Sequence, residues 1–446
     1  MPVGPGHVCG RSKSAASSQC HGRSARPGVT DMIANLDEKI CRQSNLGVTA
    51  VTAAPMPSRS VSIDYLRAFV IFLVVAFHSA LAYLPYAPAP AEHFVGRLEA
   101  WRAFPVMDSQ RSAAAGIFFL VNNSFFMTLM FFVSGLFVWR SLERKGGASF
   151  LRDRLLRLGV PFLVGAMTIP PVAHFASYLQ TSDEPTFGAY WRAWWALSDR
   201  PIGPVWFNAM LLVFDFAAVG LLAIAPKWGE RIGALASRGG ERPARFFAVV
   251  LILSALAYVP LALAYGDGTW TQWGLFQFQT SRPVHYFVYF IMGVAVGVHG
   301  LRRGLLSHDG ALARRWPIWA LAAAGFGALV VFLAVATMTS KGPAQSVFVC
   351  ASDLAFVPSC ATLSFALLAV FTRFVQRSNP MFDSLSANSY GIYIVHYPFV
   401  AWLQFALLHA SLTGTEKWAL VAIAAYAASW LSTAAARRLP GVARII

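Results

Sequence analysis

The stretch IDYLRAFVIFLVVAFHSALAYL, residues 63 to 84, is an apolar segment that carries Arg67 and His78 eleven residues apart. Its length allows it to cross a bilayer, since about 20 helical residues span the hydrocarbon core. Ionisable side chains are costly in lipid, so they usually face the protein interior and serve a function there. Eleven residues make about three helical turns, which places both side chains on one face, ~16 Å apart. We expect this face to carry a cation near one membrane surface and a proton-exchanging imidazole deeper in.

The composition is that of a membrane protein. The chain has 446 residues, of which 57% are hydrophobic and 13% are charged, whereas about a quarter are charged in soluble proteins. A net charge of +16 would suggest a nucleic-acid partner in a soluble protein. Here the basic residues form short clusters between long apolar runs. We therefore expect a lipid bilayer and no nucleic acid as the partner.

Apolar windows long enough to cross a bilayer recur along the chain. Turn signals such as Gly146-Gly147 and Gly342-Pro343 separate them. The pattern predicts an all-α integral membrane protein, a bundle of about ten transmembrane helices. The predicted spans lie near residues 63–84, 115–139, 158–179, 205–225, 246–265, 284–300, 317–338, 345–372, 387–411 and 418–436.

The distribution of Lys and Arg predicts the orientation of this bundle. With a cytoplasmic N-terminus, the inner segments hold 27 of these residues and the outer loops hold eight. Cytoplasmic loops of membrane proteins carry an excess of Lys and Arg. We therefore expect both termini to be cytoplasmic.

Three segments are expected along the chain. Residues 1–58 have no apolar core of the kind that a secretory signal needs, and they predict a disordered cytoplasmic tail. Met32 and Met56 within it offer alternative starts. The ten-helix membrane domain is expected over residues 59–437, followed by a short cytoplasmic tail, 438–446. The cysteines show no metal-ligand spacing, so no metal is expected.

The first polar cluster consists of Asp64, Arg67 and His78. Asp64 and Arg67 lie one turn apart and can form an ion pair; they also suit an interfacial anchor, with Asp64 capping the helix. His78 suits proton transfer, since the unperturbed pKa of histidine is about 6.5. Its alternative role is a hydrogen bond between packed helices. The functional interpretation makes His78, Arg67 and Asp64 the catalytic group.

The second polar cluster is the basic stretch over residues 140–157, which includes Arg152, Arg154 and Arg157. Arg154 and Arg157 lie one helical turn apart. Positive-inside topology explains some of these charges. The set also suits a cytoplasmic phosphate site, because guanidinium groups bind phosphate bidentately. The residues alone are compatible with both interpretations.

Other polar residues lie within the predicted spans, and most are expected to form hydrogen bonds between helices. Asp215 and Asp353 are the costliest of them and are candidates for lining a water-filled cavity. Ser134 and Gly135 stand where two helices can approach closely. The full set of mid-membrane polar residues is Asn122, Asn123, His174, Asn208, Asp215, His285, Asp353, His396 and Gln404.

Five motifs in a fixed order resemble the acyltransferase 3 family of integral-membrane acyltransferases. They are D-x-L-R (64–67) with its R-x10-H spacing to His78, FFVSGLF (131–137), R-x-x-R (154–157) before Pro161, GPVWF (203–207) and NSYGIYIVHYPFV (388–400). The resemblance covers roughly residues 60 to 437 and looks closest to the branch that includes glucan-succinylating enzymes of the bacterial envelope. Pro204 stands where some relatives carry a histidine.

The resemblance implies an O-acyltransferase of the bacterial inner membrane. Its donor would be cytoplasmic acyl-CoA, either acetyl-CoA or succinyl-CoA, with no bound cofactor. Its acceptor would be a hydroxyl of an envelope carbohydrate or a related molecule. The main alternative from the residues alone is a proton-coupled transporter or flippase for an envelope precursor, although the sequence shows no internal symmetry of the kind that many transporters have.

The resemblance also assigns roles to individual residues. His78 matches the essential histidine and acts as general base, and Arg67 matches its arginine partner. Arg154 and Arg157 match the paired arginines that bind acyl-CoA, with Arg152 beside them. The possible pore or acceptor contacts are Trp206, His396, Asp215 and Ser134.

Overall fold

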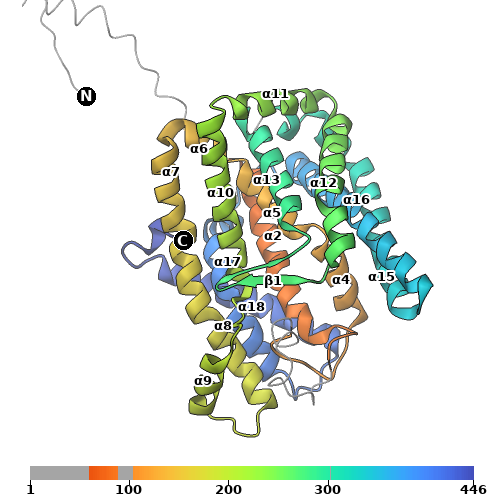
Figure 1. Ribbon diagram of the computed structural model, residues 1–446. Coiled ribbons are helices and arrows are strands. Elements are labelled where there is room, and N and C mark those ends of the chain that lie inside the picture. Colours follow the sequence, from red (N-terminus) through yellow and green to blue (C-terminus); the bar gives the residue numbers. More distant parts are fainter. Residues whose placement is uncertain (1–59, 89–103, 302) are drawn as a thin grey trace, which may run out of the picture. The chain divides into compact units, whose positions relative to one another are not determined.

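The computed structural model describes residues 60–88, 104–301 and 303–446, and the predicted tail over 1–58 lies outside them. The described chain is built almost entirely of helices (Figure 1). The α-helices in chain order are α2 (Val61–Ala80), α4 (Ala113–Asn123), α5 (Phe126–Gly135), α6 (Val138–Lys145), α7 (Gly147–Arg154), α8 (Val160–Thr181), α9 (Phe187–Ala196), α10 (Trp206–Ile224), α11 (Trp228–Glu241), α12 (Pro243–Tyr265), α13 (Pro283–Val298), α14 (Ala311–Arg314), α15 (Trp316–Thr339), α16 (Pro343–Phe374), α17 (Pro380–Ala406) and α18 (Gly414–Ala436).

Short elements complete the architecture. The 3-10 helices are η1 (Leu81–Tyr83), η4 (Gly203–Val205), η5 (Gly304–Leu306) and η6 (Val442–Arg444), and η3 (Leu155–Gly159) is a π-helix. Strands β1 (Trp270–Trp273) and β2 (Phe276–Gln279) form an antiparallel hairpin between α12 and α13. We call the two ends of the bundle the α6–α7 end and the α9 end, as they appear at the top and bottom of Figure 1.

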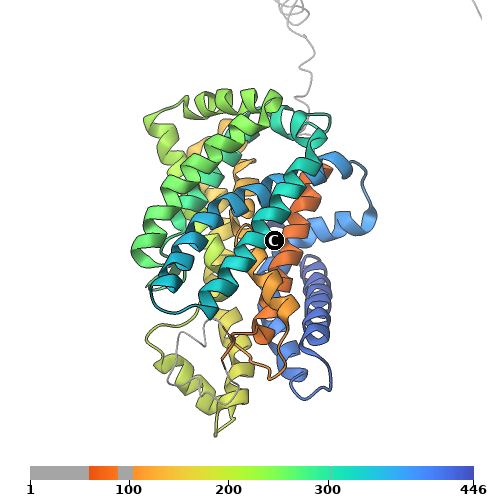
Figure 2. The same ribbon diagram turned by 90° about the vertical axis from the view of Figure 1, so that its right-hand side faces the viewer.

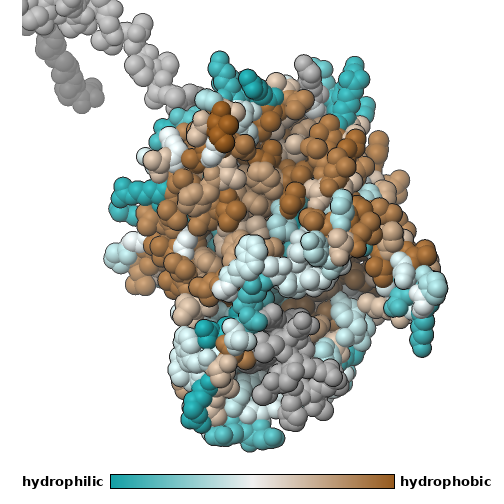
Figure 3. All heavy atoms as spheres, in the orientation of Figure 1, coloured by the Kyte–Doolittle hydropathy of each residue, from teal (hydrophilic) through white to brown (hydrophobic). Residues whose placement is uncertain are grey.

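The prediction of an all-α integral membrane protein is confirmed. Eight helical segments of the described chain are long and apolar enough to cross a bilayer: Val61–Tyr83, Ala113–Lys145, Gly147–Thr181, Gly203–Ile224, Pro243–Tyr265, Trp316–Thr339, Pro343–Phe374 and Gly414–Ala436. Of the other two predicted spans, 284–300 becomes the shorter apolar helix α13, and 387–411 corresponds to the end of α17, which carries many polar residues, and the turn after it. Hydrophobic side chains gather over α10, α12 and α15, between more hydrophilic ends (Figure 3).

Two helices at the centre of the bundle, α2 and α17, position the polar residues that the sequence singled out. α2 packs against α16, α17 and α18, and α17 also packs against α8. α2 is buried on most of its surface, as expected of an apolar helix in the interior of a bundle. α16, which packs against α2, also packs along α15 (Figure 2).

Glycines bring α5 and α13 into close contact. A Cβ atom added at Gly293 would lie 2.0 Å from the carbonyl oxygen of Phe132, and one at Gly297 would lie 2.1 Å from that of Leu136. Gly135 on the facing helix is equally restricted, since its Cβ would lie 2.2 Å from the carbonyl oxygen of Phe290. Small residues four apart commonly permit such approach of membrane helices. The close approach expected at Gly135 is thus observed.

Two predicted spans differ from the continuous helices that the sequence suggested. The span 115–139 is interrupted between α4 and α5, and the carbonyl oxygen of Asn123 beside the break accepts a hydrogen bond from Arg282 Nη1 at 3.2 Å. The span 158–179 is part of a longer run that contains the π-helix η3. Pro161 explains the distortion, because its ring lacks an N–H and crowds the carbonyl four residues earlier.

A buried ion pair ties the α9 end together. Lys417 Nζ lies 2.7 Å from Asp108 Oδ2, and both side chains are 1% exposed. The ammonium also donates to the carbonyl oxygen of Leu408 at 3.1 Å. Because Lys417 lies at the start of α18, the pair joins this helix to the loop that precedes α4.

Replacing Lys417 by Met should destabilise the protein by about 3–5 kcal/mol, because the Asp108 carboxylate would remain buried without its partner. Thermal unfolding of the purified protein in detergent measures the loss. The double variant Lys417→Met/Asp108→Leu should recover part of it, and Lys341→Met, at an exposed position, should change little. An unchanged melting temperature for Lys417→Met would contradict a stabilising role for the pair.

Candidate active site

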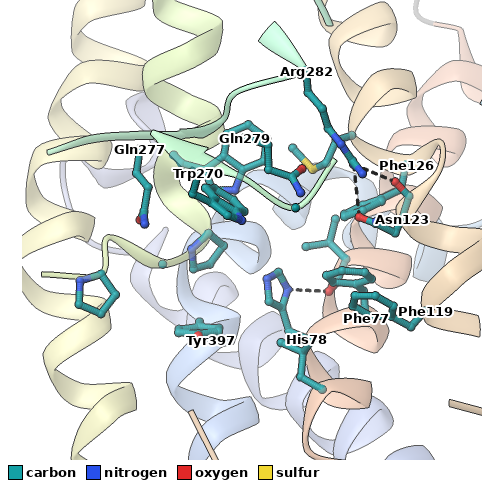
Figure 4. Close-up of a pocket in the computed structure, with 18 of the residues that line it drawn as sticks. Phe77, His78, Phe119, Asn123, Phe126, Trp270, Gln277, Gln279, Arg282 and Tyr397 are labelled. Atoms are coloured by element: carbon teal, nitrogen blue, oxygen red, sulfur yellow. Dashed lines mark hydrogen bonds between the residues drawn. The ribbon is translucent and has the colours of Figure 1, made fainter. Parts of the chain in front are cut away.

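A cavity of about 540 Å³ lies beside His78. Its walls come from α2, from α4 and α5 around their break, from the segment leading into α10, from the β1–β2 hairpin, and from α13 and α17. His78 is half-buried, and its ring points into the space that Trp270 and Gln279 border from the opposite side (Figure 4). The deeper basic group of α2 thus faces an internal cavity.

Two histidines from distant parts of the chain meet at this cavity. His78 Nδ1 lies 2.9 Å from the carbonyl oxygen of Val74 and 3.1 Å from His396 Nε2. His396 Nδ1 lies 2.6 Å from the carbonyl oxygen of Tyr393. Carbonyl oxygens only accept hydrogen bonds, so we assign the proton to Nδ1 in both rings. His396 Nε2 then accepts from His78, and His78 Nε2 carries a lone pair toward the cavity.

Neighbouring side chains hold His78 in place. The amide of Gln404 donates to the carbonyl oxygens of His78 and Ser79 at 3.2 and 3.1 Å. The ring of Tyr397 meets the imidazole edge-on at a centroid distance of 5.4 Å. Both residues lie on α17, as does His396, so one helix fixes the backbone and the ring of His78.

One wall of the cavity beside His78 is aromatic and apolar. Phe77 stacks on Phe119 at 4.5 Å and contacts Phe126 at 4.9 Å between ring centroids. The break between α4 and α5 places these rings together, since Phe119 lies before the break and Phe126 after it. This wall suits an apolar group next to the imidazole.

Arg282 lines the cavity although the sequence suggested no role for it beyond an outer-loop charge. Its side chain is 2% exposed. Two of its nitrogens bind the Asp267 carboxylate at 2.9 to 3.1 Å, and Nη1 binds Asn123. Burial opposes the charged form, but the Asp267 carboxylate together with Tyr286 and Tyr258 outweighs it, so the pKa of Arg282 lies above its usual value. Arg282 is therefore a fully engaged cation that joins α13 to the break in the second span.

Arg67 and Asp64 lie at the opposite end of α2. Arg67 Nη2 is 3.9 Å from Asp64 Oδ1 and 3.4 Å from the carbonyl oxygen of Ser386 in α17. The pair lies outside the cavity lining. Arg67 and His78 lie in one continuous helix, and α17 contacts α2 near both of them, through Ser386 at Arg67 and through His396 at His78.

Arg154 pairs with Asp215 at the α6–α7 end. Arg154 Nε lies 3.2 Å from Asp215 Oδ2, without the alignment of a hydrogen bond, and the guanidinium lies over the ring of Phe150. Arg152 and Arg157 are exposed nearby. None of the three arginines lines the cavity, and neither does Asp215. The structure therefore joins two predicted site residues, Arg154 and Asp215, in a second cluster.

A stripe of polar groups on α17 connects the two clusters. The hydroxyl of Tyr390 donates to the carbonyl oxygen of Arg157, which Pro161 cannot bond, and accepts from Asn208 Nδ2 at 3.1 Å. One turn further, the hydroxyl of Tyr393 donates to the carbonyl oxygen of Pro204. His396 follows three residues later. Residues three and four apart share a helix face, so this stripe leads from the arginines to His78.

Of the remaining residues predicted as pore or acceptor contacts, some lie at the cavity and one lies away from it. Trp206 lines the cavity, and His396 touches His78 directly. Ser134 lies near the end of α5, outside the lining. Among the described residues, no three His, Cys, Asp or Glu side chains gather in a way that could hold a metal ion.

Comparison with known proteins gives one family match. Residues 60–434 match the model of a family described as an acyltransferase domain, in its type 3 form. No curated protein and no solved structure matches the chain.

The proton position in His78 can be tested by ¹⁵N NMR of histidine-labelled protein. We expect Nδ1 to be protonated and Nε2 to be unprotonated, because both neighbours of Nδ1 accept. The signal is assigned from its loss in His78→Gln. His396→Leu removes one acceptor and should increase the Nε2–H form, whereas His308→Leu, an exposed histidine, should not. A protonated Nε2 in the wild type would contradict the assignment.

Proposed function

The chain belongs to the acyltransferase 3 family, whose model matches residues 60–434, and on this premise we propose that His78 is its general base. The protein is a membrane O-acyltransferase. We propose cytoplasmic acyl-CoA as the donor and a hydroxyl of an envelope carbohydrate or related molecule as the acceptor. The observation that supports this most strongly is the His78 imidazole, which lines a 540 Å³ cavity and whose Nε2 has no hydrogen-bond partner among the described residues. Family membership favours this enzyme over the proton-coupled transporter.

The reaction requires a base and a place for two substrates. His78 Nε2 takes the proton of the acceptor hydroxyl while its oxygen attacks the thioester carbonyl carbon. The tetrahedral intermediate then collapses, the carbon–sulfur bond breaks, and the proton passes from Nε2 to the departing sulfur. The products are an O-acyl ester and free CoA. Val74 and His396 stabilise the transient imidazolium, because both accept from Nδ1.

The cluster at the α6–α7 end supports a cytoplasmic donor site. By the positive-inside rule this basic end faces the cytoplasm, and Arg152, Arg154 and Arg157 can bind the phosphates of CoA. Asp215 orients Arg154 at 3.2 Å. The polar stripe on α17 offers a route for the pantetheine arm toward His78. Tyr390 and His396 are about 9 Å apart along the helix axis.

The apolar wall supports a place for the acyl group. An acetyl or succinyl group carried to His78 would lie against Phe77, Phe119 and Phe126, which exclude water from the thioester. We propose acetyl-CoA or succinyl-CoA as the donor. A location in the bacterial inner membrane and a relation to the glucan-succinylating branch belong to the same proposal.

Replacing His78 by Ala should lower the rate of acyl transfer by about 10²–10⁴-fold, the typical contribution of a general base. Transfer from labelled acyl-CoA by the purified protein measures this. Matched elution and melting temperature establish folding, and His299→Ala, whose ring bonds Gly233 at the other end of the bundle, is the control. Equal transfer by His78→Ala and wild type would remove His78 from the mechanism.

Replacing Arg157 by Ala should weaken acyl-CoA binding roughly tenfold or more, since a hydrogen bond to a charged group is lost. Arg154→Ala is best tested with Asp215→Asn, so that no unpaired carboxylate is buried. The variants should also bind CoA and dephospho-CoA esters with more similar affinities than the wild type does. Arg231→Ala, exposed on α11, serves as control. Unchanged affinities in both variants would mean that these arginines do not bind acyl-CoA and serve only to orient the protein in the membrane.

A further inference from the structure

The β1–β2 hairpin presents two chemically different faces. Trp270 pairs with Gln279, and Gln272 pairs with Gln277. Side chains that are paired across strands share a face, and alternate residues along a strand point to opposite faces. One face therefore carries Trp270 and the three glutamines, and the other carries Thr271, Trp273, Phe276 and Phe278.

The glutamine face is the one that faces His78. Trp270, Gln277 and Gln279 line the cavity, whereas Trp273 lies outside the lining and is 70% exposed. Figure 4 shows Trp270, Gln277 and Gln279 on the far side of the cavity from His78. A strand face that directs glutamines into a cavity differs from the usual arrangement, in which the inward face of a strand is apolar.

The amides of this face are incompletely used by the protein. Gln277 is 8% exposed, and its side chain has no hydrogen-bond partner among the described residues. Gln279 makes one contact, from Nε2 to the carbonyl oxygen of Asp267 at 3.5 Å. Gln277 and Gln279 both line the cavity, and an amide can donate and accept hydrogen bonds, so the pair is suited to receive a ligand.

The chemistry of the wall indicates the ligand class. Amide groups both donate and accept, as hydroxyl groups do. Trp270 contacts Trp206 edge-on at 6.3 Å, and Trp206 stacks on Tyr286 at 6.0 Å, which makes an aromatic surface beside the amides. The cation of this wall, Arg282, is already bound by Asp267 and Asn123. The described lining therefore favours an uncharged, hydroxyl-rich ring over an anionic one.

We propose that Trp270, Gln277 and Gln279 form the acceptor site, which binds an uncharged sugar ring stacked on Trp270 with its hydroxyls bonded to the two amides. The ring then lies between the hairpin and His78, so one of its hydroxyls reaches Nε2. This inference rests on the proposed function. It makes the hairpin, which lies outside the predicted catalytic residues, the element that selects the acceptor.

The test uses purified full-length protein in nanodiscs and labelled acyl-CoA. The two probes are the neutral and the acidic carbohydrate fractions from the envelope of the cells that produce the protein. We expect acylation of the neutral fraction. Trp270→Ala and Gln277→Leu should each raise the KM for this acceptor about tenfold, with the KM for acyl-CoA within about twofold of wild type. Trp273→Ala, on the opposite hairpin face, is the matched control and should behave as wild type.

Three results would overturn the inference. They are unchanged acceptor KM in both hairpin variants, a raised KM for acyl-CoA in place of the acceptor, and acylation confined to the acidic fraction. The conservative variant Gln277→Asn should restore part of the acceptor affinity, which guards against a folding defect. If wild-type protein turned over no acyl-CoA with either fraction, the proposed function itself would fail.

Discussion

The site depends on one contact, the hydrogen bond between the imidazoles of His78 in α2 and His396 in α17. An ionisable ring inside an apolar bundle needs partners for its polar atoms. Val74 and His396 both accept from Nδ1 of His78, and this leaves Nε2 as the basic atom toward the cavity. This contact also joins the two central helices, α2 and α17. The hydrogen bond from Gln404 of α17 to the carbonyl oxygen of His78 joins them a second time.

Irregular backbone serves this arrangement at two places. The break between α4 and α5 exposes the carbonyl of Asn123 to Arg282 and brings Phe126 to the cavity. The π-helix before Pro161 leaves the carbonyl of Arg157 to Tyr390. Within membranes, non-helical backbone persists where it is buried in protein or lines a cavity. The first distortion borders the cavity beside His78, and the second lies where the polar stripe of α17 begins at the basic end.

Much of the fold, and part of the candidate site, could be predicted from residues that are close together in the sequence. The lengths of the apolar windows predicted the membrane spans, and the helical period predicted that Arg67 and His78 share one face of α2. The partners of these residues could not be predicted in the same way, because His396 is 318 positions from His78. The hairpin was missed because strands of four residues are too short to stand out between apolar windows. Arg282 counted only as a loop charge until its burial against Asp267 was visible.

The central claim is that donor and acceptor meet at Nε2 of His78. A cryo-electron microscopy structure of the protein with a non-hydrolysable thioether analogue of acyl-CoA tests this most directly. We expect phosphates at Arg154 and Arg157, a pantetheine arm along α17, and the acyl carbon in van der Waals contact with Nε2. An analogue bound at the opposite end of the bundle, or an acyl group separated from His78 by packed side chains, would contradict it.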